Sequence, residues 1–266
     1  MAVGRVYLMG VGPGDPELMT VKAARLLREV DVVVFDRLVS PEILEQIPPG
    51  TTRIYAGKGP RNHHLTQEEI NTLLCGLARS GRSVARVKGG DPFVFGRGSE
   101  EAEHLAQDGI PYEIVPGVTA ASGGSAYAGI PLTHRGMATG VRYVTGHLRE
   151  DMVLDHNWGS LADPDTTLVI YMGLTSFHGI ARNLMDAGLP PDTPAAAIQN
   201  ATTSRQRRVL GTLGDLPQRV EEAQLSAPTI FVVGRVVSLA GTLDWFQPAA
   251  TTVKAEEMEP DETAIG

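Results

Sequence analysis

Short apolar runs alternate with stretches of helical spacing along most of the chain. Segment 6–12 is an apolar run that ends in glycines, and segment 31–36 is a run of valines between two aspartates. From Thr20 on, four apolar residues recur at intervals of three, which predicts a helix with one buried face. They are Val21, Ala24, Leu27 and Val30. Strands and amphipathic helices in alternation are typical of an α/β fold.

Later segments continue this alternation. Thr66 with Glu69 three residues on forms a capping box, which predicts the start of a helix. Ile70, Leu73, Leu74 and Leu77 then give it one apolar face. Further strands are predicted at 83–88 and 112–115, with a helix over 98–108. In the second half we predict strands near 141–145, 167–171, 195–198, 208–211 and 229–233, and helices near 176–187 and 216–223.

A turn followed by small residues separates the two halves. Pro116 and Gly117 form the turn signal, and segment 118–126 after it consists almost entirely of small residues. We therefore expect an N-terminal α/β domain over 1–116 and a C-terminal α/β domain over 117–246. From Lys254 to the end the chain holds five acidic residues and no aromatic residue, so 247–266 is expected to be an acidic, disordered tail.

Composition narrows the classes of function. A net charge of −8 and an aromatic content of 5% disfavour nucleic-acid binding, which needs basic surfaces and stacking side chains. No apolar run approaches the roughly 18 residues that span a membrane, and no signal-peptide pattern opens the sequence. We therefore expect a cytoplasmic enzyme. The single cysteine, Cys75, excludes an internal disulfide and is expected to be a buried thiol. The seven histidines show no strong ligand pattern, so no metal site is expected.

The first glycine-rich segment, GVGPGD at 10–15, follows a predicted strand. A dinucleotide fingerprint needs a third glycine where this chain has Asp15, and Pro13 removes a backbone donor from the loop. A nicotinamide oxidoreductase is therefore disfavoured. The glycines still allow the backbone to approach a ligand closely.

The second glycine-rich segment, KGGDPFVFGRGSEE at 88–101, also follows a predicted strand. Open α/β sheets bind ligands at the carboxyl ends of their strands, so this segment predicts a site. Arg97 and Glu100 lie three residues apart at the start of a helix, where they form either a surface ion pair or part of that site. In a third segment, 115–135, small residues allow either tight helix packing or close ligand approach.

Together these segments resemble the uroporphyrinogen-III C-methyltransferase family, within the larger tetrapyrrole methyltransferase group. The matching motifs, between about residues 5 and 246, are GVGPGDPELMTVKAARLL, VVVFDRLVS, AGKGPRNHHLTQEEIN, VKGGDPFVFGRGSEE, VPGVTAASGGSAYAGIPLTHR, VTGHL, YMGL and FVVGRVV. FDRLVS, FGRGSEE, GIPLTHR and VTGHL are the more specific ones. The resemblance implies two α/β domains with S-adenosyl-L-methionine (SAM) bound in a cleft between them, outside any Rossmann pocket, and a homodimer.

The resemblance also implies roles for single residues. SAM would contact Pro13, Gly89, Gly90, Asp91, Val94, Thr119, Ala120, Met172 and Ala201. The family often has glycine in place of Ala201 and asparagine in place of Thr175, so these two positions depart from its pattern. The acidic residue and the amine-bearing residue that the family has at its site correspond to Asp36 and Lys58.

The implied substrate, uroporphyrinogen III, carries eight carboxylates, which the planar fork of arginine suits. Arg37, Arg97 and Arg135, with Met172, are expected to contact it, whereas Arg61 and Arg142 are equally compatible with ordinary surface residues.

The implied reaction transfers methyl groups from the sulfonium of SAM to ring carbons C2 and then C7, giving precorrin-2 and two S-adenosylhomocysteine molecules. A base must remove a proton, and Arg97 and Asp36 are the candidates. Since an arginine pKa lies above about 12, Arg97 could instead stabilise developing charge, oriented by Glu100.

Two other readings stay open at this stage. A sister enzyme acting on a later corrin precursor would share the SAM cleft. A non-catalytic SAM or tetrapyrrole sensor would keep the fold without turnover.

Overall fold

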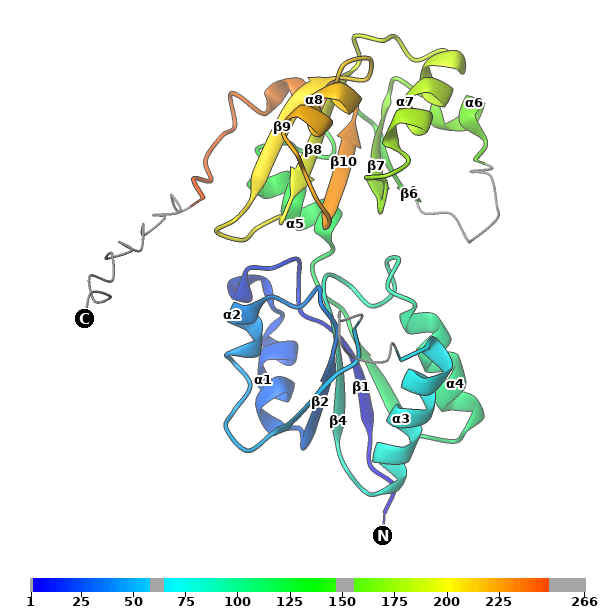
Figure 1. Cartoon of the computed structure of the whole chain (residues 1–266), viewed down its shortest axis with the longest axis vertical. Coiled ribbons are helices and arrows are strands. Elements are labelled where there is room, and N and C mark those ends of the chain that lie inside the picture. The colour runs from blue at the N-terminus through cyan, green and yellow to red at the C-terminus, as the bar shows by residue number, and fades with distance from the viewer. Residues whose placement is uncertain (1, 58–64, 147–155, 249–266) are drawn as a thin grey trace, which may run out of the picture.

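The computed structural model describes residues 2–57, 65–146 and 156–248. Within these residues the chain forms two five-stranded sheets, one above the other in Figure 1. We call the first sheet with its helices the first lobe and the second sheet with its helices the second lobe. Most of the predicted acidic tail lies outside the described residues. No helix in the described ranges combines the length and the apolar character that crossing a membrane requires.

The first sheet is entirely parallel, in the order β3-β2-β4-β1-β5. Its strands are β1 (Val6–Gly10), β2 (Val32–Phe35), β3 (Thr52–Tyr55), β4 (Val84–Lys88) and β5 (Tyr112–Val115). Helices α1 (Val21–Glu29) and α2 (Pro41–Leu44) cover one face, and α3 (Gln67–Arg79) and α4 (Gly98–Gln107) cover the other (Figure 1). A short 3-10 helix, η1 (Pro16–Leu18), follows β1. Because side chains alternate along a strand, each face has its own apolar cluster.

Helix α1 buries a different face from the predicted one. Ala23, Leu26, Leu27 and Val30 are buried, whereas Val21 is 89% exposed. The apolar spacing of three and four residues therefore begins at Ala23 and not at Val21. Val21 lies two positions earlier, about 200° around the helix axis, and so faces away from the sheet.

Helix α3 begins as predicted. The capping box of Thr66 and Glu69 is present, since each side chain accepts a hydrogen bond from the other residue's backbone N–H. Ile70 and Leu74 are buried, and Cys75 is a buried thiol in the same apolar cluster, as predicted.

The second sheet is mixed, in the order β6-β7-β10-β8-β9, with only β6 and β7 parallel. Its strands are β6 (Gly140–Thr145), β7 (Thr166–Tyr171), β8 (Pro194–Gln199), β9 (Arg207–Thr212) and β10 (Thr229–Val233). One face packs against α7 (Phe177–Asp186) and α8 (Leu216–Glu222), where the rings of Phe177 and Phe231 stack with centroids 3.9 Å apart. The other face packs against α5 (Ala120–Tyr127) and the 3-10 helix η2 (Arg235–Leu239). Helix α6 (Trp158–Leu161) packs beside α7.

Candidate active site at the junction of the two lobes

The carboxyl ends of β1, β2, β4 and β5 point toward the second lobe, so the loops that follow these strands face it (Figure 1). We define the lobe junction as loops 11–19, 36–40, 89–97 and 116–119 of the first lobe with loops 172–176 and 200–206 of the second. Direct contacts join the two sides. The backbone N–H of Asp15 donates to Thr202 Oγ1 at 3.0 Å, and the rings of Phe95 and Tyr171 lie 4.9 Å apart. Most of the predicted site residues are in these loops.

Three glycines bring the loops after β1, β4 and β5 into backbone contact. A Cβ added to Gly10 would lie 2.5 Å from the carbonyl oxygen of Gly90, and one added to Gly117 would lie 2.2 Å from the same oxygen. Gly12 and Gly90 also exchange two backbone hydrogen bonds, of 3.2 and 2.7 Å. The N–H of Gly12 is therefore occupied and does not serve a phosphate. The strand order also differs from that of a dinucleotide-binding fold, so both observations oppose the nicotinamide interpretation.

Asp91 anchors the loop after β4. Its Oδ1 accepts a hydrogen bond from the N–H of Phe93 at 2.8 Å, and its Oδ2 accepts one from the N–H of Gly117 at 3.0 Å. The carboxylate therefore fixes the loops after β4 and β5 relative to each other. A direct contact of Asp91 with SAM stays a prediction.

Tyr171, at the end of β7, fastens the first turn of α5. Its hydroxyl lies 2.6 Å from Thr119 Oγ1 and accepts a hydrogen bond from the N–H of Ala121 at 2.9 Å. Burial raises the pKa of Tyr171, so the group stays a neutral phenol. The sequence did not single it out, although it opens the YMGL motif. It thereby joins the end of β7 to Thr119 and the start of α5.

Replacing Tyr171 by phenylalanine should lower the free energy of unfolding by about 1–3 kcal/mol, because a buried N–H and a threonine hydroxyl lose their partner. Urea unfolding measures this loss. Tyr143 packs on the same ring, at 6.0 Å, but is more exposed, so Tyr143→Phe should cost less than about 0.5 kcal/mol. Equal effects of the two changes would contradict the anchoring role of Tyr171.

Strained backbone concentrates at the lobe junction. Six described residues other than glycine have positive φ, and five of them lie in its loops. These five are Phe95, Arg97, Met172, Asn200 and Thr202, and the sixth is Gln224. Such conformations cost about 1–3 kcal/mol each and cluster at functional sites. Met172, with a φ of 55°, is 48% exposed at the end of β7, where a ligand can cover it.

Arg97 and Glu100 form the predicted pair at the start of α4. Arg97 Nε and Nη2 donate to the two carboxylate oxygens of Glu100 at 2.9 and 2.6 Å. Both side chains are more than half exposed. The hydrogen bond to Glu100 raises the pKa of Arg97, which opposes a role for Arg97 as the base. The N–H groups of the Arg97 guanidinium that do not donate to Glu100 can still bind an anion.

Asp36 directly follows β2, at the carboxyl ends of the strands of the first sheet. Its Oδ1 accepts a hydrogen bond from the N–H of Leu38 at 3.0 Å, and its Oδ2 lies 3.4 Å from Arg86 Nη2. The side chain is 23% exposed, so it can reach a ligand. Arg37, next in the chain, is exposed.

Behind Asp36 lies a buried charged cluster that the sequence reading missed. Arg86 and Lys88, on the fully buried strand β4, both donate to Oε1 of Glu101, at 3.1 and 3.0 Å. Burial and the charge of Arg86 lower the pKa of Lys88. The sequence contains a signal for the cluster, since two cations interrupt an apolar strand and Glu101 shares a helix face with Leu105.

The remaining predicted SAM contacts are core or near-core residues at the junction. Pro13 and Ala201 both touch α5, since a Cβ on Gly123 would meet Pro13 at 2.6 Å and one on Gly124 would meet Ala201 at 2.9 Å. Val94 packs against the apolar cluster of the second lobe.

The other arginine and lysine candidates do not lie in the described part of the lobe junction. Arg142 donates hydrogen bonds to the carbonyl and the hydroxyl of Ser160, and so links β6 to α6. Arg135 lies in the exposed segment between α5 and β6, and no contact among the described residues joins it to the other candidates. Thr175 is exposed in the loop after β7. Lys58 and Arg61 lie outside the described residues.

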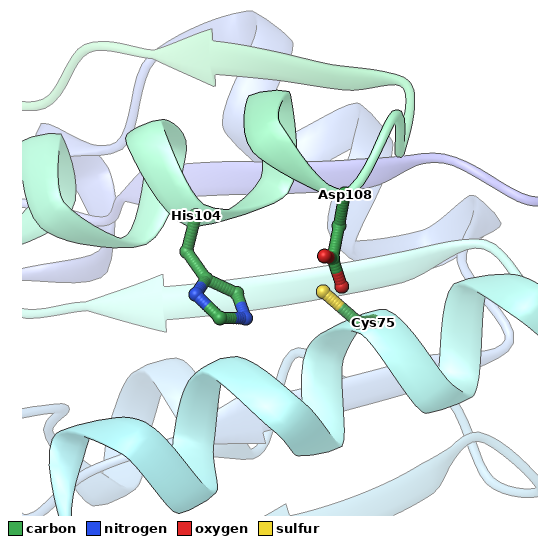
Figure 2. Close-up of side chains that lie close together, drawn as sticks. All are labelled: Cys75, His104 and Asp108. Carbon is green, nitrogen blue, oxygen red and sulfur yellow. The ribbon is translucent and has the colours of Figure 1, made fainter.

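One group of potential metal ligands lies away from the junction, between α3 and α4. Cys75, His104 and Asp108 present ligand atoms within 4.8 Å of one another (Figure 2). However, Asp108 accepts a hydrogen bond from Arg79 at 2.9 Å, and burial with the Asp108 contact raises the pKa of the Cys75 thiol to about 11. The group fastens the two helices, and its carboxylate is already paired.

The protein-family comparison matches residues 5–217 to the model described as Tetrapyrrole (Corrin/Porphyrin) Methylases. This chain belongs to the tetrapyrrole methylase family. It is 53% identical over 253 residues to a siroheme synthase of Nitrosospira multiformis. The aligned region covers 95% of this chain and 53% of that protein. The chain thus spans about half the length of the curated relatives it matches.

Solved structures of tetrapyrrole methylases match over nearly their whole length. A uroporphyrin-III C-methyltransferase from Thermus thermophilus is 41% identical, with a TM-score of 0.76, covering 92% of this chain and 98% of that one. A crystal structure described as that enzyme complexed with S-adenyl homocysteine is 40% identical, with a TM-score of 0.74, covering 88% and 93%. The α/β fold with two sheets is therefore the tetrapyrrole methylase fold, as predicted.

Proposed function

We propose that this chain is a SAM-dependent C-methyltransferase that converts uroporphyrinogen III to precorrin-2, with methylation at C2 and C7 and release of S-adenosylhomocysteine. The observation that carries the proposal is the near-full-length match to the Thermus thermophilus uroporphyrin-III C-methyltransferase, which has also been crystallised with S-adenyl homocysteine. The proposal concerns the methylation step only, since the siroheme synthases extend well beyond this chain.

The lobe junction fits a ligand with polar and apolar parts. Gly90 has a φ of 72°. Among the described residues beyond its chain neighbours, a Cβ there would meet only Ala120 N and Thr119 Cα, at 3.7 and 3.8 Å. Backbone groups of the two loops therefore line a space that a glycine leaves open. Met172 and Val94 add apolar contacts, the mixture typical of small-molecule sites. Bound SAM would supply an activated methyl group here, held by the residues that the family motifs name.

The cations of the junction suit an anionic macrocycle. Arg97 presents its outer N–H groups while Glu100 fixes its inner ones, so the fork is oriented before a carboxylate arrives. Arg37 is exposed in the same junction and can add a second cation. Arg135 is exposed outside the junction, and its contact with the substrate stays a prediction. Each charge-assisted bond contributes about 1.5–3 kcal/mol where water is excluded.

Asp36 is the better candidate for the base. A carboxylate accepts a proton readily, whereas the pKa of Arg97 is raised further by Glu100. Asp36 is partly exposed at the carboxyl end of β2, and its two oxygens are oriented by Leu38 and Arg86. It would take up the proton that the methylated pyrrole ring must lose. Arg97 would then stabilise charge and hold a carboxylate.

The test is an anaerobic incubation of the purified protein with SAM and uroporphyrinogen III, followed by mass spectrometry of the tetrapyrrole. We expect a gain of two methyl groups and two molecules of S-adenosylhomocysteine for each product molecule. A gain of one would indicate a slow second step. No gain, with S-adenosylhomocysteine still bound in a parallel titration, would contradict the proposed substrate and favour a later corrin precursor or a sensor.

Three further predictions belong to the proposal. They are a division into domains at 1–116 and 117–246, a homodimer, and a location in the cytoplasm. The homodimer comes from the family resemblance, whereas the division and the location come from the sequence pattern. The change from one sheet to the other, between Val115 and Gly140, supports the division into domains.

A further inference from the structure

The buried cluster behind Asp36 has a single shared acceptor. Oε1 of Glu101 accepts hydrogen bonds from Arg86 Nε at 3.1 Å, Lys88 Nζ at 3.0 Å and Gln67 Nε2 at 3.2 Å. Glu101 is fully buried, and Arg86 and Lys88 are almost so. Oε2 of Glu101 is also buried and accepts no hydrogen bond from the described residues. Three ionic side chains are therefore removed from water around one oxygen atom.

Such a cluster is a costly way to join β4 to α3 and α4. Each buried ion loses much of its favourable hydration, and apolar residues of similar volume often replace buried ion pairs without loss of stability. The neighbours on the same strand, Val84, Ala85 and Val87, are apolar and fully or almost fully buried. A packing role alone gives no reason for the charges at 86 and 88.

The cluster reaches the lobe junction through Arg86. Glu101 holds Nε of its guanidinium, and the carbonyl of Val87 accepts from Nη1 at 3.1 Å. The plane of the guanidinium is thereby fixed, and Nη2 lies 3.4 Å from Asp36 Oδ2. The N–H of Leu38 holds the other oxygen of Asp36. The carboxylate is thus oriented from both sides.

We propose that Arg86 and Glu101 are positioning residues that hold the Asp36 carboxylate in the orientation needed for proton removal during methyl transfer. Lys88 balances the charge, since the two cations face the two carboxylates of Asp36 and Glu101. The inference rests on the proposed function, because it takes Asp36 as the base. A structural role for the cluster would instead affect stability without acting through Asp36.

A double-mutant cycle separates the two roles. Arg86→Met, Asp36→Asn and the double variant are compared by single-turnover methyl transfer with the tetrapyrrole that the wild type methylates. We expect Asp36→Asn to slow the transfer by about 100-fold, as for loss of a general base. Arg86→Met should slow it by about 10-fold, and the double variant should be no slower than Asp36→Asn, since both changes act through one group. S-adenosylhomocysteine affinity should stay within about 3-fold throughout.

Glu101→Gln keeps the shape of the side chain and provides a second cycle with Asp36→Asn if Arg86→Met does not fold. Arg79→Met is the control, because it breaks an ion pair with Asp108 between the same two helices away from Asp36. It should change the rate less than about 2-fold.

The inference would be overturned if the rate loss of the double variant were the product of the two single losses. It would also be overturned if Asp36→Asn left the rate unchanged. Methylation by the wild type of a later corrin instead of uroporphyrinogen III would overturn the proposed substrate, while the same cycle would still decide the role of Arg86.

Discussion

Alanine in place of Gly117 should destabilise the fold by about 3 kcal/mol or more and abolish binding of S-adenosylhomocysteine. The new Cβ would lie 2.2 Å from the carbonyl oxygen of Gly90 and 2.8 Å from the carbonyl carbon of Gly10. Overpacking usually costs about 1–3 kcal/mol, because side chains rearrange. Here the overlap is with backbone, and Gly90 cannot move without losing its hydrogen bonds to Gly12. Urea unfolding and isothermal titration with S-adenosylhomocysteine measure the two effects.

Gly76→Ala is the matched control. Gly76 lies in α3. Apart from its chain neighbours and the backbone of its own helix, no heavy atom of the described residues lies within 4 Å of a Cβ placed there. Alanine in a helix interior is favoured over glycine by about 0.5–1 kcal/mol, so this variant should be slightly more stable and bind normally. A Gly117→Ala protein as stable as Gly76→Ala, with unchanged affinity, would show that the three loops are not packed as described.

Lysine in place of Arg97 should lower kcat/KM for the tetrapyrrole by about 100-fold and leave the affinity for S-adenosylhomocysteine within about 3-fold. Lysine keeps the charge but cannot hold both oxygens of Glu100 and a substrate carboxylate at once. A charge-assisted bond of about 1.5–3 kcal/mol corresponds to a factor of roughly 10 to 150. Steady-state kinetics with varied tetrapyrrole, beside a binding titration, give both numbers.

Arg219→Lys is the comparison for Arg97, because Arg219 is also an exposed arginine paired with an acid, Asp215, which precedes α8. This variant should change kcat/KM less than about 2-fold. If Arg97→Lys weakened S-adenosylhomocysteine binding as much as it lowered kcat/KM, Arg97 would belong to the cofactor side of the junction and not to the substrate side.

The fold could be predicted well where the pattern was simple. Buried parallel strands are mostly apolar, so β1 and β2 stand out as short runs, and β4 was predicted although Arg86 and Lys88 interrupt it. Strand β3 did not, because three of its four residues are exposed at the edge of the sheet and show no apolar run. The single-turn helices α2 and α6 are too short to show a period. The face of α1 was misplaced because Val21 is apolar but points into solvent.

The site was predictable only as a set of motifs. Family resemblance named loops that the structure does bring together, but spacing along the chain cannot reveal contacts such as that of Tyr171 with Thr119. Glu100 and Glu101 illustrate the difference. The sequence favoured the first, which pairs with Arg97 at the surface, whereas helix phase turns the second inward to Arg86.

The positions of the new methyl groups test the central claim most directly. Product formed anaerobically from uroporphyrinogen III and SAM labelled with ¹³C in its methyl group can be examined by ¹³C NMR. The account predicts two labelled methyl groups, on C2 and C7 of the macrocycle. Label on other ring carbons, or an unlabelled tetrapyrrole beside protein that binds S-adenosylhomocysteine, would contradict it.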